Sequence, residues 1–185
     1  MELEWSVHVR SYPGAPRGGD AGVVVPLDDG ALVALIDASG HGLTAYAVAQ
    51  TARKTLLHAM SSEPGAVLRA LDAALAGSIG AAVSVARIRG RKLEFAGVGN
   101  VEASVGLRPL SVRAGVVGQR MNSPQVVTVP FEPDTWLLMH TDGVSSPRGI
   151  PGGSAETAAR ALVEAHGSLH DDAGVVLVRW RERQP

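Results

Sequence analysis

Residues 31–42 read ALVALIDASGHG, an apolar run that ends in an acidic residue and a glycine-rich turn. A short apolar run bounded by turn residues is typical of a β-strand. Beyond the turn, apolar residues recur at helical spacing from residue 43 to residue 60. We therefore expect a strand that ends at Ile36, with Asp37 held at its end, followed directly by a helix.

Most of the remaining chain has the patterns of strands. Residues 3–10 alternate between apolar and polar side chains, and Asp28-Asp29-Gly30 is a typical hairpin turn between strands at 22–26 and 31–36. Further strands are predicted at 80–89, 91–98, 101–106, 110–114, 125–130, 135–141 and 175–180. Helices are predicted at 43–60, 63–76 and 154–166, with Ser62 and Ser154 as caps of the last two. Because strands dominate and helices come in separate blocks, we expect an α+β fold with largely antiparallel sheets.

The composition excludes several classes of protein. A chain of 185 residues with 45% hydrophobic and 19% charged residues is expected to form a single folded domain over residues 1–185. Its 17 basic and 18 acidic residues give a net charge of −1, which argues against nucleic-acid binding and attachment to anionic membranes. The absence of cysteine excludes disulfides, thiolate nucleophiles and zinc ribbons. With neither a signal-peptide pattern nor a membrane-spanning run, we expect a cytoplasmic protein.

Acidic residues stand at several of the predicted strand ends. Asp37 and Asp142 follow strands, Asp20 precedes one, and Asp171 and Asp172 precede the last. If these ends share one edge, the carboxylates converge and their repulsion requires a cation between them. Carboxylate oxygens without cysteine or a histidine pair suit Mg²⁺ or Mn²⁺. A two-metal site of this kind clamps phosphoryl oxygens and lowers the pKa of a bridging water, so a phosphate ester is the natural substrate.

Each of these residues also has a purely structural interpretation. Aspartate beside glycine is a common turn former, and we assign Asp28, Asp29 and Asp134 to turns. His41, which lies between two glycines, is either another turn residue or a proton carrier.

Four short segments occur in an order that resembles a known family. They are Gly18-Gly19-Asp20, Ile36-Asp37-Ala38-Ser39-Gly40-His41-Gly42, Thr141-Asp142-Gly143 and Asp171-Asp172-Ala173-Gly174. Together they resemble the PPM-type serine/threonine phosphatases, and more narrowly the bacterial SpoIIE-like branch. The resemblance covers nearly the whole chain and implies an α-β-β-α sandwich, in which two antiparallel sheets carry helices on both outer faces.

The resemblance also implies an activity and a set of site residues. The expected reaction removes phosphate from phosphoserine or phosphothreonine of a protein, with two Mn²⁺ or Mg²⁺ ions. By position, Asp37 would bridge both ions and the backbone carbonyl of Ala38 would bind one of them. Asp142 and Asp171 would complete the ligands of the second ion, and Asp20 would hold metal-bound waters.

Further roles are carried over less directly. The proton for the leaving alkoxide would come from a metal-bound water or from His41. An arginine binds substrate phosphate in some members of the wider family, and Arg17 and Arg10 are the nearest candidates here. Gly174 stands where the family often has a hydroxyl residue, and Ala38 where it commonly has glycine.

The expected partner follows from a narrower resemblance. The chain resembles the RsbX-like phosphatases, which reset stressosome proteins by removing phosphate from STAS-domain partners, so we expect a phosphorylated STAS-domain protein as substrate. Three alternatives remain open. They are a catalytically inactive module that binds phosphoproteins, a hydrolase of small phosphate esters and a purely structural module.

Overall fold

The computed structural model describes residues 2–60, 62–145 and 147–181. Within these residues the named strands form two five-stranded sheets and one two-stranded sheet, all paired antiparallel. The first sheet has the order β1 (Glu2–Arg10), β12 (Ala173–Arg181), β11 (Leu137–His140), β6 (Glu102–Val105) and β7 (Arg108–Leu110). The second has the order β10 (Val127–Pro130), β5 (Lys92–Val98), β4 (Ala81–Arg89), β3 (Gly30–Ala38) and β2 (Asp20–Leu27). The small sheet pairs β8 (Gly115–Val116) with β9 (Arg120–Met121).

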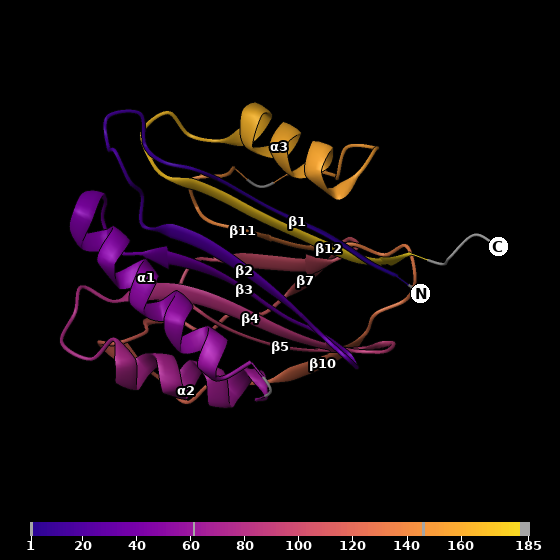
Figure 1. Ribbon diagram of the computed structural model, residues 1–185, viewed down its shortest axis with the longest axis horizontal. Helices are drawn as coiled ribbons and strands as arrows, with labels where there is room; N and C mark the ends of the chain where they lie inside the picture. Colours follow the sequence, from indigo (N-terminus) through magenta and orange to yellow (C-terminus); the bar gives the residue numbers. More distant parts are fainter. Residues whose placement is uncertain (1, 61, 146, 182–185) are drawn as a thin grey trace.

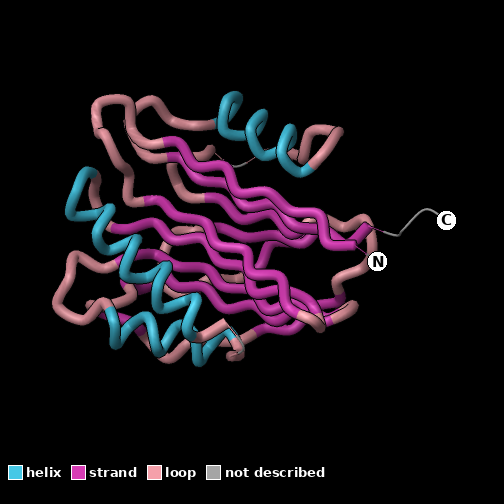
Figure 2. Tube along the Cα trace, in the orientation of Figure 1, coloured by secondary structure: helices cyan, strands magenta, loops and turns pink. Residues whose placement is uncertain are grey.

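The helices lie on the two outer faces of the stacked sheets (Figure 1). Helices α1 (Gly42–His58) and α2 (Pro64–Ala74) pack against the second sheet, whereas α3 (Ala155–His166) packs against β1 and β12 of the first. One group of buried side chains lies under α1 and α2 and another under α3. A third group fills the space between the two sheets. The expected α-β-β-α sandwich is therefore confirmed, and Figure 2 shows its helices outside and its strands within.

Strand β3 explains how this fold places a carboxylate between the sheets. Its even-numbered residues, such as Ile36, pack toward α1 and α2, and its odd-numbered residues, such as Leu35, pack toward the first sheet. Because successive side chains alternate between faces, Asp37 continues the row that faces the first sheet. The apolar run is thus buried on both faces, and its inner row ends in an acid.

Two details differ from the sequence predictions. Ser62 does not cap α2, because the cap position is Glu63, without a side-chain cap, and Pro64 with its restricted φ opens the helix. The strand predicted at 110–114 is wrong beyond Leu110. There the Arg113 N–H donates to the Gly97 carbonyl at 2.8 Å and the Arg113 carbonyl accepts from the Gly99 N–H at 2.9 Å, so this segment leaves the first sheet and runs beside the end of β5.

The cap of α3 is confirmed, since the Ser154 hydroxyl accepts a hydrogen bond from the Thr157 N–H at 3.2 Å. In the ranges that the structure describes, none of the helices combines the length and apolar character needed to cross a bilayer.

Candidate metal centre

A cleft of about 620 Å³ opens at one end of the sandwich, where β3 and β11 end and β12 begins. Asp37, Asp142, Asp171 and His41 all line it. These residues come from both sheets and from the start of α1, so the cleft exists only once the two sheets are stacked. The sequence prediction that distant acids meet at one edge is borne out for these three aspartates.

Strand pairing fixes where the carboxylates stand. Asp20 is the register partner of Asp37 across β2 and β3, so their side chains lie on the same face of the second sheet. In the first sheet, β11 pairs with β12 and His140 lies opposite Val175. Asp142, just beyond the end of β11, therefore lies close to the segment that precedes β12.

Backbone hydrogen bonds join the loops that carry Asp142 and Asp171. The Ser168 N–H donates to the Gly143 carbonyl at 2.7 Å, and the Ser145 N–H donates to the His166 carbonyl at 3.0 Å. Gly143 is required for this approach, because a Cβ there would lie 1.8 Å from the carbonyl oxygen of Asp172. The spacing between the two loops is thus built into the backbone.

The carboxylates in the cleft are electrostatically uncompensated. Burial, followed by the charges of Asp142 and Asp171, raises the pKa of Asp37 to about 7. Burial also raises the pKa of Asp171, and the charges of the neighbouring Asp142 and Asp172 raise it further. The pKa of Asp20 lies well above its ordinary value because the side chain is buried and Asp37 is close. Negative charge gathered in this way is stabilised by a bound cation.

Asp20 is held from beneath the cleft by a chain of hydrogen bonds between the sheets. The Gly174 N–H donates to the Thr141 hydroxyl at 2.9 Å, and that hydroxyl donates to Asp20 Oδ2 at 2.8 Å. Thr141 is fully buried. A Cβ at residue 174 would lie 3.1 Å from Asp20 Oδ2, so glycine leaves room for the carboxylate. Thr141 therefore supplies the hydroxyl that contacts Asp20, and Gly174 has no side chain that could supply one.

Asp172 has a different role from its neighbour. Its carboxylate is 4% exposed and accepts hydrogen bonds from the Tyr12 and Gly19 N–H groups, both at 2.6 Å. One side chain therefore ties together the two ends of the loop that leads to Asp20. A Cβ at Gly18 would lie 2.5 Å from an Asp172 oxygen, which explains the small residue there.

The remaining predicted residues are Ala38, Arg10 and Arg17. Ala38 has its side chain in the core beneath α1, and its carbonyl oxygen lies near Gly19. The Arg10 guanidinium donates to the Ser168 carbonyl at 2.5 Å, and the Arg17 guanidinium lies 4.7 Å above the Tyr46 ring. Neither arginine is among the residues that line the cleft.

The sequence analysis gave no role to two neighbours of the acids. The Asn100 side-chain amide donates to Asp142 Oδ2 at 2.5 Å, and Thr141 holds Asp20 as described. Asn100 follows a glycine at the end of β5, so it shares the position of the acids, after a strand and in a turn. That shared position was the signal available for it.

The donor set fits hard divalent cations. Among the described residues, no three His, Asp or Glu side chains stand together in a complete metal-binding geometry. Burial, followed by the charges of Asp142 and Asp171, nevertheless raises the pKa of the half-buried Asp37, and the three carboxylates repel one another in the cleft. Carboxylates that repel in this way share a proton or bind a cation, and oxygen ligands favour Mg²⁺ or Mn²⁺.

Comparisons with known proteins agree with this geometry. The family model described as stage II sporulation protein E (SpoIIE) matches residues 28–181. No curated protein matches the chain. Among solved structures, one described as "The bacterial stressosome: a modular system that has been adapted to control secondary messenger signaling" superposes with a TM-score of 0.91 at 22% identity, covering 97% of this chain and 100% of that one.

Two further structures carry metal ions. RsbX in complex with magnesium has a TM-score of 0.86 at 20% identity, covering 96% of this chain and 94% of that chain. The catalytic domain of the serine/threonine phosphatase PstP in complex with two manganese ions has a TM-score of 0.78 at 16% identity, covering 97% and 99%. At these identities the likeness is one of fold. Together with the family match over residues 28–181, it shows that this chain belongs to the SpoIIE-type family of PPM phosphatases.

Proposed function

We propose that this protein is a metal-dependent phosphatase that removes phosphate from phosphoserine or phosphothreonine of a signalling protein. The observation that carries the proposal is the cleft in which Asp37, Asp142 and Asp171 meet, where burial and the neighbouring carboxylates raise the pKa of Asp37 to about 7. A phosphate ester and a carboxylate cluster are both anionic, so they approach each other only when cations lie between them.

In this proposal, the carboxylates of Asp37, Asp142 and Asp171 and the Ala38 carbonyl would hold two Mn²⁺ or Mg²⁺ ions, and Asp20 would hold water bound to them. When bound, the ions supply Lewis-acid stabilisation of the phosphoryl oxygens and a water of lowered pKa. The RsbX and PstP structures, which contain magnesium and manganese, support this choice of ions.

The chain's own residues orient the site and handle protons. Asn100 holds one oxygen of Asp142, which leaves the other oxygen free to act as a ligand. The Thr141 hydroxyl fixes Asp20 in the same way. His41 is exposed and lines the cleft, and in this proposal its imidazole gives a proton to the serine or threonine oxygen that leaves.

We further propose that the substrate is a phosphorylated STAS-domain protein of a stressosome, in the cytoplasm. The fold likeness to RsbX and to a structure described in a stressosome context supports this choice. Removal of phosphate from such a partner would reset the signalling assembly.

The test is a phosphate-release assay on phosphorylated STAS-domain proteins, on a free phosphoserine standard and on an aryl phosphate, each with and without Mn²⁺. We expect Mn²⁺-dependent release from the protein substrate that Asp37→Asn abolishes. Metal and phosphoprotein binding without turnover would instead identify an inactive binding module. Turnover of the small esters alone would identify a small-ester hydrolase.

A further inference from the structure

Helix α1 has a second row of side chains beside the face that it buries on the second sheet. Leu43, Tyr46, Gln50, Arg53 and Leu57 follow one another at alternating spacings of three and four residues, and we call this row the outer stripe. Such spacing places all five on one side of a helix, and it is the spacing with which helices pack on one another. The stripe therefore has the pattern of a helix-binding surface.

The outer stripe is distinct from the face that α1 buries. The buried residues are Ala45, Val48, Ala49, Ala52 and Leu56, which pack on the second sheet. Leu43 is 68% exposed and Leu57 43% exposed, and Met60 in the turn after the helix is 41% exposed. Large apolar side chains that recur on an exposed face indicate a binding surface more than isolated ones do. In Figure 1, α1 lies on the outside of the molecule, with α2 beside it.

The charge of α1 has a single sign. The helix carries Arg53 and Lys54, and its sequence contains no aspartate or glutamate. Within the described residues neither cation takes part in an ion pair. The Arg17 guanidinium, stacked on Tyr46, adds a third cation beside the stripe. On a protein with a net charge of −1, this is a local concentration of positive charge.

A groove runs along the flank of the same helix. It has a volume of about 450 Å³ and lies between Thr44, Ala47 and Thr51 of α1 and Leu75 and Ile79, which follow α2. None of these residues belongs to the outer stripe, so the groove offers a recess on a different side of α1.

We propose that the outer stripe of α1 is the docking site for an acidic amphipathic helix of a partner protein. Leu43 and Leu57 would pack on the apolar row of that helix, and its carboxylates would pair with Arg53 and Lys54. A second copy of this chain fits less well. Pairing two α1 helices would place the cations of both copies in one interface, and neither helix carries an acid to pair with them.

The position of the stripe connects it to the active end of the molecule. Leu43 lies two residues beyond His41, which lines the cleft. A helix bound along α1 is therefore held beside the cleft entrance. The proposal stands on α1 alone and does not depend on the phosphatase activity.

The test uses three synthetic helical peptides of about the length of α1. The first has a leucine row flanked by glutamates, the second replaces each glutamate by lysine, and the third replaces each leucine by serine. We expect the first alone to bind the full chain in fluorescence anisotropy, with affinity falling as salt is added. Arg53→Glu should weaken it roughly tenfold and strengthen binding of the lysine peptide. Leu57→Ser should weaken the first peptide, and hydrogen exchange on the wild-type protein should slow in residues 43–58.

Arg108→Glu, an exposed cation on β7, is the matched control and should leave peptide binding unchanged. Equal affinity for the glutamate and lysine peptides would overturn the proposal. An affinity for the glutamate peptide that Arg53→Glu leaves unchanged would also overturn it. So would a dimer in analytical ultracentrifugation that Leu57→Ser converts to monomer, because the stripe would then be covered by a second copy.

Discussion

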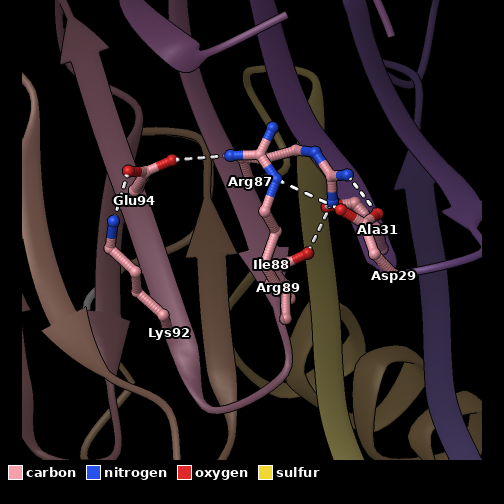
Figure 3. Close-up of polar contacts among 7 residues, drawn as sticks. All are labelled: Asp29, Ala31, Arg87, Ile88, Arg89, Lys92 and Glu94. Atoms are coloured by element: carbon pink, nitrogen blue, oxygen red, sulfur yellow. Dashed lines mark hydrogen bonds and ion pairs between the residues drawn. The ribbon is translucent and has the colours of Figure 1, made fainter. Parts of the chain in front are cut away.

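The two ends of strand β3 hold aspartates in opposite electrostatic states. At the start of the strand, Asp29 accepts hydrogen bonds from Arg87 and Arg89 (Figure 3). The bond from Arg87 holds the pKa of Asp29 below its ordinary value. At the other end, burial and neighbouring carboxylates raise the pKa of Asp37 to about 7. The same residue type, at the two ends of one strand, is paired with arginines at one end and surrounded by carboxylates at the other.

The difference separates structural acids from functional ones. At the turn end the protein supplies its own cations, and Lys92 lowers the pKa of Glu94 in the same way. The acids at that end are therefore paired with cations of the protein itself. At the cleft end the charges that act on Asp37 are other carboxylates, so this group takes up a proton or a cation from solution. An uncompensated acid cluster in a cleft is a stronger functional signal than the Asp-Gly motif itself.

The largest effect is expected from Asp37→Asn. Removing the shared carboxylate should lower Mn²⁺-dependent phosphate release by at least about 100-fold, because even residues that only support metal ligands cost 10–100-fold. Asp29→Asn is the matched control at the compensated end and should retain activity. Steady-state kinetics of the two variants check this, and equal losses would contradict the division between the two ends.

The next effect is on stability, at the compensated end. Arg87 is 3% exposed, and its guanidinium also donates to the carbonyls of Ala31 at 3.2 Å and Ile88 at 2.5 Å. Arg87→Ala removes the donor to those carbonyls and leaves a cavity, so we expect a loss of about 2–3 kcal/mol in the free energy of unfolding. Urea denaturation measures it. Activity per folded molecule should stay at the wild-type level, and a specific loss of Mn²⁺ affinity would argue against a purely structural role.

A smaller effect is expected from a change at Thr141, the uncharged residue that hydrogen-bonds Asp20 near the cleft. Thr141→Val keeps the shape but removes the hydroxyl that donates to Asp20, so Mn²⁺ affinity in titration calorimetry should fall roughly tenfold. Thr141→Ser restores the donor and should bind within about twofold of wild type. If valine and serine weaken Mn²⁺ binding equally, the methyl packing of Thr141 matters and its hydroxyl does not.

Local patterns predicted most of the elements, and a resemblance was needed to order them. The alternation at residues 3–10 and the helical spacing after Gly42 are properties of neighbouring residues, so they are readable from sequence. The meeting of Asp37 with Asp142 depends on stacking two sheets, which the resemblance implied and spacing alone did not. Asn100 was missed because a Gly-Asn turn resembles any other turn. Arg87 was missed because nothing local distinguishes a buried cation in a strand from a solvated one.

The remaining prediction concerns the pH dependence of stability, which should have opposite signs at the two ends. The pKa of Asp37 is about 7 in the folded protein and near 3.8 when exposed, so the folded state binds the extra proton between these values. Without divalent metal, stability should therefore be highest below about pH 4 on account of this group and fall as the pH rises through 7. Asp29 and Glu94 have lowered pKa values, so their contribution is present above about pH 4 and lost on acidification.

Thermal melts from pH 3 to 8 in EDTA separate the two contributions. Asp37→Asn should flatten the fall toward neutral pH, and Asp29→Asn should flatten the loss in acid. Added Mn²⁺ should also remove the fall toward neutral pH in the wild type, because a bound cation stabilises the ionised carboxylates that are otherwise unfavourable. A neutral-pH fall that persists in Asp37→Asn, or that Mn²⁺ leaves untouched, would mean that the carboxylates of the cleft are already compensated within the chain.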